Sequence, residues 1–304
     1  MKKEYQNTIG GELEIQGLGL HTGEMVRLRI KPAEVNSGFT FIRTDAKANN
    51  RIPATLDNVV STDRGTSIGN GNVIVHTVEH LLAALAGAKI DNAIIEVTGT
   101  EMPILDGSAG IFVNKIKEAG TLTQDSERKY IIPKTKITYH DEATGSELTL
   151  LPDEDLSIAV KIDFGTEVLD IQEAYLDSIA EFNDRIATCR TFVFLHELEF
   201  LLAHNLIKGG DLNNAIVFVN KPISQEELNR LAKVFDKPEV KVMERGVLNN
   251  LKLRYENEPA RHKLLDLLGD LTLLGKPIKG KIIAFKPGHK VNYEFGKKIV
   301  ESLK

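Results

Sequence analysis

The spacing of apolar residues predicts a strand-rich first part of the chain that also contains two helices. Within residues 24–32, Val26, Leu28 and Ile30 alternate with basic residues, which is typical of a half-buried strand. The other strands expected in this part are residues 38–43, 52–60 and 92–97. Helices are expected at residues 73–86, ending at Gly87, and at residues 109–119, with Ser108 as the N-cap.

After a charged run at residues 123–129, which we interpret as a linker, a similar succession of elements begins again. Strands are expected at residues 136–139, 147–151, 156–164 and 282–285, and helices at 178–187, 225–235, 261–271 and 292–303. A βαβ-sized unit is expected between residues 191 and 219. It consists of an apolar segment at 191–195, a helix at 197–205, the pair Gly209 and Gly210 and a strand at 215–219. Residues 238–258 are mostly polar and are expected to be irregular.

The two parts of the chain share a sequence motif. HLLAALAG at residues 80–87 aligns with HKLLDLLG at 262–269, and a short apolar strand, a glycine-containing loop and a helix follow each copy. Because such an echo indicates duplication, we predict an α+β protein of two duplicated domains, residues 1–125 and 126–304, each a sheet layered with helices. A pseudo-symmetric pair would bring the two motif helices together, so that their histidines converge on a site between the domains.

Composition and charge exclude several classes of protein. Of the 304 residues, 42% are hydrophobic and 27% are charged, as in ordinary soluble proteins, and the net charge of −5 gives no reason to expect nucleic-acid binding. Cys189 is the only cysteine, so neither an intrachain disulfide nor a thiolate zinc cluster is expected. No apolar run approaches the roughly 18 residues of a transmembrane segment, and the start lacks a secretory signal. A soluble, cytoplasmic protein is therefore expected.

Three residues from the two motif copies could bind one divalent metal ion. His262 and Asp266 are four positions apart on an expected helix and therefore share a face. Taken alone, this pair is more often two polar residues on a solvated face. With His80 there would be three protein ligands and an open fourth position for water, as in catalytic zinc sites. HELEF at residues 196–200 lacks the second histidine of the zincin motif HExxH, and we reject it as a metal site.

Groups suited to proton transfer lie near these residues in the sequence. Glu79 directly precedes the first histidine ligand and suits a general base. His289 is a candidate general acid, and Asp270 could hold its imidazole in the required tautomer and charge state. Thr191 could donate a hydrogen bond to a developing oxyanion.

Six longer motifs resemble one enzyme family. They are GLGLHTG (17–23), TVEHLLAALAG (77–87), MPILDGSA (102–109), CRTFVF (189–194), RHKLLDLLGDL (261–271) and KPGHKVN (286–292). The chain resembles the UDP-3-O-acyl-N-acetylglucosamine deacetylases, the zinc amidases of lipid A biosynthesis in Gram-negative bacteria, from about residue 5 to its end. The resemblance implies removal of the N-acetyl group from UDP-3-O-(3-hydroxyacyl)-N-acetylglucosamine, with release of acetate. It also implies one catalytic Zn²⁺, whose ligands could hold Fe²⁺ instead.

The resemblance assigns roles to individual residues. It implies metal ligands at His80, His262 and Asp266, a general base at Glu79, a proton donor to the leaving amine at His289, an oxyanion donor at Thr191 and a polar neighbour of His289 at Asp270. Lys263 matches a polar residue that lines the site, Phe192 a residue that contacts the substrate, and Leu20 a residue near the acyl passage. We interpret His21 and His76 as structural residues.

The family fold implied by the resemblance agrees with a duplicated architecture. It consists of two α+β layers with the active site between them, and a βαβ insert in the second domain, here about residues 191–219, forms a hydrophobic tunnel for the acyl chain. Simple core packing of the insert is the alternative interpretation. The chain departs from many relatives at Gly165 and Thr166, where they have His-Pro, which leaves the nucleotide contacts there open.

Two questions of identity remain open at the level of sequence. The segment at residues 220–258 is longer than in the simplest members of the family, as it is in relatives with a fused hydroxyacyl-ACP dehydratase. The chain could therefore be a whole protein or the excised first part of a fusion. The sequence shows no dehydratase. The competing functions are a zinc amidase or peptidase acting on another acyl substrate, and a binding module whose histidines are structural.

Overall fold

The computed structural model describes residues 3–198, 208–209, 214–249 and 251–303. The first large sheet has five strands in the order β2-β3-β9-β4-β5. Their bounds are Leu13–Leu18 (β2), Met25–Pro32 (β3), Ala93–Val97 (β9), Phe39–Arg43 (β4) and Arg51–Pro53 (β5). Neighbouring strands are antiparallel except for β4 and β9, which are parallel. The predicted alternation in β3 is confirmed, because Val26, Leu28 and Ile30 are buried and the residues between them are exposed.

A second five-stranded sheet repeats the connectivity of the first. Its order is β11-β12-β17-β13-β14, and its only parallel neighbours among these strands are β13 and β17. The bounds are Ile137–Asp141 (β11), Ser146–Leu151 (β12), Gly280–Phe285 (β17), Leu156–Ile162 (β13) and Gln172–Leu176 (β14). The predicted duplicated α+β fold is confirmed, whereas the exact boundary between residues 125 and 126 stays a prediction.

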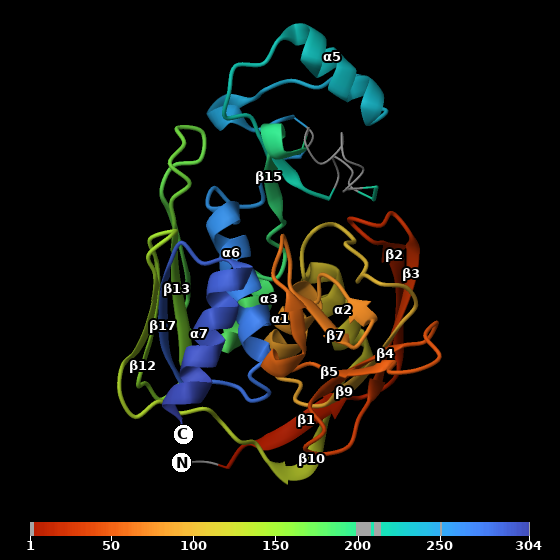
Figure 1. Cartoon of the computed structure of the whole chain (residues 1–304), viewed down its shortest axis with the longest axis vertical. Helices are drawn as coiled ribbons and strands as arrows, with labels where there is room; N and C mark the ends of the chain where they lie inside the picture. Colours follow the sequence, from red (N-terminus) through yellow and green to blue (C-terminus); the bar gives the residue numbers. More distant parts are fainter. Residues whose placement is uncertain (1–2, 199–207, 210–213, 250, 304) are drawn as a thin grey trace.

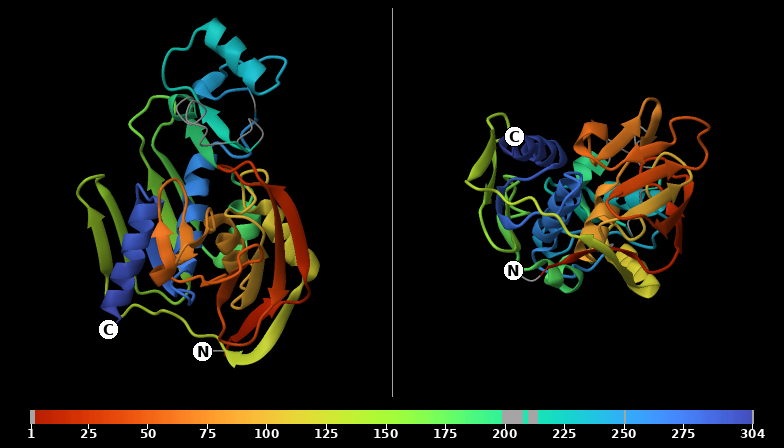
Figure 2. Two further views of the ribbon diagram at one scale, coloured as in Figure 1. Left: turned by 45° about the vertical axis from the view of Figure 1, so that its right-hand side comes forward. Right: turned by 90° about the horizontal axis from the view of Figure 1, so that it is seen from below.

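Helices form the layers between the two large sheets. They are α1 (Glu79–Gly87) and α2 (Gly110–Ala119) on the side of the first sheet, and α6 (Glu258–Thr272) and α7 (His289–Ser302) on the side of the second (Figures 1 and 2). A Cβ atom on Gly269 would lie 2.1 Å from the carbonyl oxygen of Glu79, so α1 and α6 meet at a backbone contact that admits only glycine at this position. The two motif helices therefore pack directly against each other.

The predicted helix at residues 73–86 is wrong at its start. Val73–Val75 form strand β8, and α1 begins only at Glu79. Consecutive β-branched residues favour the strand, and Thr77, with φ 60, has a left-handed backbone that a helix cannot include. His76 and His80 therefore do not share a helix.

The predicted linker at residues 123–129 and the predicted strand at 52–60 are also corrected. Thr121–Glu127 form strand β10, which pairs antiparallel with β1 (Tyr5–Ile9). The charged residues that suggested a linker lie on this exposed two-stranded ribbon, where solvent reaches them. A 3₁₀ helix, Leu56–Asn58, interrupts the second segment before β6 (Val59–Ser61), which joins β7 (Ser67–Asn70) and β8 in a small sheet.

The predicted insert projects from the end of the molecule near β13 and α6 (Figure 1). Its strands β15 (Phe192–Phe194) and β16 (Ile216–Phe218) are parallel, as a βαβ unit requires. The helix predicted at 197–205 and Gly210 lie largely outside the described residues. α5 (Gln225–Val234) matches the helix predicted at 225–235 and begins with a capping box of Ser224 and Glu227. At the helix predicted for residues 178–187, a short 3₁₀ helix and α3 (Phe182–Arg185) follow Ser178. In the described ranges, no helix is long and apolar enough to cross a membrane.

Candidate metal centre and active site

Two histidines and an aspartate from the two motif copies meet between the sheets. His80 lies on the first turn of α1, and His262 and Asp266 lie one turn apart on α6. The Nε2 atoms of His80 and His262 are 3.6 Å and 3.3 Å from Oδ1 of Asp266, and the three ligand atoms all lie within 4.8 Å of one another. Each residue is at most 5% exposed. Such a group can hold a metal ion.

The hydrogen bonds and charges of this group fit a bound cation. Nδ1 of His262 lies 3.0 Å from the carbonyl oxygen of Cys189, so Nε2 is the ring nitrogen that faces Asp266. Burial lowers the pKa of His262 to about 3, which keeps the imidazole neutral. Burial favours the neutral form of Asp266, but nearby positive charge, including the ammonium of Lys263, outweighs burial and holds the pKa of Asp266 well below its ordinary value. Among the described residues, buried Oδ1 of Asp266 has no hydrogen-bond partner, and a cation would satisfy it.

Glu79 lies beside this group at the start of α1. Its Oε2 atom accepts a hydrogen bond of 2.9 Å from the backbone N–H of Thr66. Burial raises the pKa of Glu79 above the ordinary value. A carboxylate whose pKa is shifted towards neutral pH is a more effective proton acceptor, so this position suits a general base.

His289, the first residue of α7, is held by a network centred on Asp270. Nδ1 of His289 is 3.0 Å from Oδ2 of Asp270, and the same oxygen accepts a hydrogen bond of 2.8 Å from the side-chain amide of Asn292. The other oxygen, Oδ1, accepts a hydrogen bond of 2.5 Å from the hydroxyl of Thr66. Burial alone would lower the pKa of His289, but the charge and hydrogen bond of Asp270 and the charge of Asp266 raise it to about 9. The ring is therefore an imidazolium near neutral pH and can donate a proton.

A cavity of about 360 Å³ brings the predicted site residues together. On its wall are Leu20, Glu79, His80, Thr191, Phe192, His262, Lys263, Asp266 and His289. Asp270 contacts His289, which lies on the cavity wall. Nζ of Lys263 lies 2.7 Å from Oδ2 of Asp266 and 5.7 Å from the ring centre of Phe192. The volume is that of a small-molecule site.

Comparison with known proteins assigns the chain to a family. The family model described as LpxC, UDP-3-O-acyl N-acetylglycosamine deacetylase, matches residues 6–301. The chain belongs to this family. It is 36% identical over 299 residues to a UDP-3-O-acyl-N-acetylglucosamine deacetylase of Syntrophus aciditrophicus, an alignment that covers 98% of this chain and 86% of that protein.

Relatives of the LpxC family that are bifunctional match with higher identity. The chain is 44% identical over 299 residues to the "Bifunctional enzyme LpxC/FabZ" of Porphyromonas gingivalis, and 43% identical over 299 residues to that of Bacteroides thetaiotaomicron. Each alignment covers 98% of this chain, which spans 65% of the length of each of these two relatives.

Two residues of this LpxC-family site were not predicted from the sequence. Thr66 contacts both Glu79 and Asp270, the latter across 204 positions of the chain, and Asn292 fixes Asp270 from α7. Thr66 has no local sequence signal, because its contact with Asp270 depends on how the two domains pack. Asn292 ends the motif KPGHKVN, but the motif does not show that this residue contacts Asp270. His21 also lies on the cavity wall, although the sequence suggested only a structural role.

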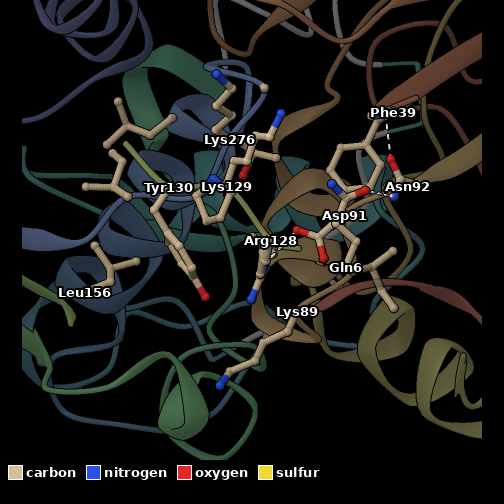
Figure 3. A pocket seen from close by; sticks show the side chains of 18 of the residues that line it. Gln6, Phe39, Lys89, Asp91, Asn92, Arg128, Lys129, Tyr130, Leu156 and Lys276 are labelled. Atoms are coloured by element: carbon tan, nitrogen blue, oxygen red, sulfur yellow. Dashed lines mark hydrogen bonds and ion pairs between the residues drawn. The ribbon is translucent and has the colours of Figure 1, made fainter. Parts of the chain in front are cut away.

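A second cavity, of about 540 Å³, lies near the C-terminal ends of α1 and α6 (Figure 3). Tyr130, Phe39 and Leu156 contribute to its wall, and Arg128 pairs with Asp91 at 2.7 Å. The described residues that line this cavity include no histidine or cysteine, and the candidate metal ligands lie elsewhere. Although this cavity is larger than the first, its described lining contains none of the candidate metal ligands.

Arg190 and Glu258 form a buried ion pair close in the chain to Thr191 and His262. Nε of Arg190 is 2.9 Å from Oε1 of Glu258, and the carboxylate also accepts the backbone N–H groups of Arg190 (3.0 Å) and Arg254 (2.7 Å). The pair joins the segment that contains Thr191 to the start of α6, one turn before His262. It therefore helps to fix both residues in place.

Glu258→Gln is expected to lower the free energy of unfolding by about 3–5 kcal/mol, because the guanidinium of Arg190 would stay buried without a counter-charge. Thermal and urea unfolding measure the change. The matched control is Glu181→Gln, which removes the partly exposed partner of Arg185 (2.6 Å) and should cost at most about 1 kcal/mol. Equal, small losses in both variants would contradict the role of the buried pair.

Proposed function

We propose that the protein is a zinc-dependent amidase that removes the N-acetyl group from UDP-3-O-(3-hydroxyacyl)-N-acetylglucosamine and releases acetate, the committed step of lipid A biosynthesis. The main support is the buried group of His80, His262 and Asp266, which opens on the same cavity as Glu79 and His289. Relatives named UDP-3-O-acyl-N-acetylglucosamine deacetylase support the substrate. Nitrogen and oxygen ligands suit zinc, although Fe²⁺ could occupy the same site.

When bound, zinc supplies a Lewis acid that polarises the acetamide carbonyl and lowers the pKa of water. The chain's own residues perform the proton transfers. Glu79 takes a proton from the attacking water, and the raised pKa of its buried carboxyl group suits this task. His289, kept charged by Asp270, donates a proton to the departing amine nitrogen. Thr191 donates a hydrogen bond to the oxyanion of the tetrahedral intermediate.

The remaining predicted residues are assigned to substrate binding. Lys263 offers a cation, Phe192 an aromatic face beneath that cation, and Leu20 an apolar surface on the same cavity. Further apolar side chains from the insert line the cavity and would receive the acyl chain: Val193, Phe194, Leu198 and Val217. Burial of these apolar surfaces by an acyl chain is favourable at about 25 cal/mol per Å².

The setting of the reaction is part of the proposal. We assign the protein to the cytoplasm, with the domain boundary at residues 125–126 and the insert at about 191–219. The UDP-linked acylated glucosamine is its expected small-molecule partner. A fused dehydratase partner is suggested by relatives named bifunctional LpxC/FabZ, of which this chain spans 65%.

The deciding experiment measures acetate release from UDP-3-O-acyl-N-acetylglucosamine before and after chelation, with zinc titrated back. Release should vanish on chelation and return at about one zinc per chain, because the three ligands form one site. Release of acetate only from another amide would overturn the substrate but not the metal centre. If neither zinc binding nor release is observed, the proposed reaction is wrong and a binding module is favoured.

A further inference from the structure

The carboxylate of Glu101 connects two segments that border the catalytic cavity. It is completely buried, and it lies just after the first sheet, at a bridge between residues 76 and 101. From the first segment it accepts hydrogen bonds from the backbone N–H groups of His21 (3.0 Å) and Thr22 (3.0 Å) and from the hydroxyl of Thr22 (3.1 Å). It also lies 2.7 Å from Nδ1 of His21. From the second it accepts the hydroxyl of Thr77 at 3.2 Å.

The first segment is the loop at residues 19–22, which forms part of the cavity wall. The side chains of Leu20 and His21 line the cavity. A Cβ atom on Gly19 would lie 2.6 Å from Oε2 of Glu101, so the loop folds directly onto the carboxylate. The backbone carbonyls of residues 20 and 21 accept hydrogen bonds from Gly209 (3.1 Å) and Lys208 (3.2 Å). The loop thus links the first domain to the insert.

The second segment is the approach to α1, and its backbone is strained. Thr77 has φ 60, a left-handed conformation that is a genuine outlier for a β-branched residue. Such strain persists only where surrounding contacts hold it, and it is concentrated at functional sites. Glu79 and His80 come two and three residues later. The direction in which α1 starts, and with it the position of both side chains, therefore depends on Thr77.

Glu101 is ionised at neutral pH. Burial favours its neutral form, but the hydrogen bonds from His21 and Thr22 outweigh burial and hold its pKa below the ordinary value. Five of its contacts come from N–H or O–H groups or from an imidazole nitrogen. Only a carboxylate offers two oxygen acceptors to this many donors.

We propose that Glu101 is a positioning residue that fixes the substrate-side loop at residues 19–22 and the left-handed backbone of Thr77 relative to each other, and so aligns the cavity wall with Glu79 and His80. The inference rests on the proposed function for its kinetic consequences. Its structural consequences do not depend on that function, since the same carboxylate holds both segments whatever substrate binds.

The test combines Glu101→Gln with Thr77→Gly. The amide of glutamine keeps one oxygen acceptor and turns an NH₂ group towards the donors, so both segments loosen. Glu101→Gln should lower kcat by about 10- to 100-fold and raise KM, because small misplacements of catalytic groups are costly. Glycine adopts φ 60 without strain, so the double variant should regain most of the lost kcat while its KM stays raised. A general structural defect would not produce this split.

Two further variants complete the kinetic test. Thr77→Val keeps the β-branched shape but removes the hydroxyl, and it should lower kcat with little change in KM, even if Glu101→Gln fails to fold. The control Glu96→Gln, on β9 away from the cavity, should match the wild type. Wild-type kinetics for Glu101→Gln, or a double variant as slow as Glu101→Gln, would overturn the proposal.

Hydrogen–deuterium exchange gives a readout that needs no substrate. Glu101→Gln should speed amide exchange at residues 19–23 and 77–82, and adding Thr77→Gly should restore protection only at 77–82. If the wild type releases no acetate, the proposed function fails while this exchange pattern still decides the role of Glu101. Unchanged exchange in both segments would show that the carboxylate does not hold them.

Discussion

Glu79→Gln is expected to lower the turnover number for acetate release by about two to four orders of magnitude. Glutamine keeps the volume of the side chain, and its carbonyl oxygen can still accept the hydrogen bond that the N–H of Thr66 makes to Glu79 at 2.9 Å. An amide cannot take a proton from water, however, so the base is removed while the local packing is kept. Steady-state acetate release, with zinc content measured on the same sample, gives the result.

The zinc content separates this effect from loss of the metal. Glu79 is not one of the three grouped ligands, so the variant should bind as much zinc as the wild type. Glu118→Gln is a suitable control, because Glu118 is exposed on α2 and pairs only with Lys115 among the described residues. Near-normal turnover of Glu79→Gln would show that another group accepts the proton, and the assignment of the base would be wrong.

The duplicated architecture and the grouping of His80, His262 and Asp266 could be predicted because both leave local sequence signals. A repeated helix motif shows in the residue pattern, and the spacing of His262 and Asp266 places them on one face of α6 without knowledge of the rest of the fold. The convergence of His80 required only that the repeat be pseudo-symmetric. The structure supplies its physical cause, which is the glycine at position 269 that lets α1 and α6 touch.

Apart from the contact between Asp270 and His289, the network around these residues could not be predicted, because it depends on contacts between distant segments. Thr66 reaches Asp270 across 204 positions, and Glu101 reaches His21 across 80. Nothing in the sequence next to Thr66 distinguishes it from a surface threonine, and the motif that follows Glu101 does not show that its carboxylate contacts His21. The left-handed backbone of Thr77 is equally hidden, since β-branched residues disfavour that conformation, and the error at the start of α1 has this cause.

Loss of Asp266 is expected to have the second large effect. Asp266→Ala should weaken zinc binding by more than about 100-fold, because even the outer partners of metal ligands are typically worth 10–100-fold. The variant removes the oxygen that lies 3.3 Å and 3.6 Å from the two imidazole nitrogens. Acetate release should fall with zinc occupancy. Zinc titration against a competing chelator measures the affinity, and acetate release is followed at saturating zinc.

Asp270→Asn is the matched comparison, since Asp270 lies one turn further along α6 and faces His289 rather than the grouped ligands. It should keep zinc affinity and lose turnover, because His289 would lack the charge that holds its imidazolium. Asp266→Asn adds a third case: it keeps the side-chain shape but leaves the partly buried ammonium of Lys263 without its counter-charge at 2.7 Å. If Asp266→Ala bound zinc as tightly as Asp270→Asn, the three-residue centre would be wrong, whatever the reaction proved to be.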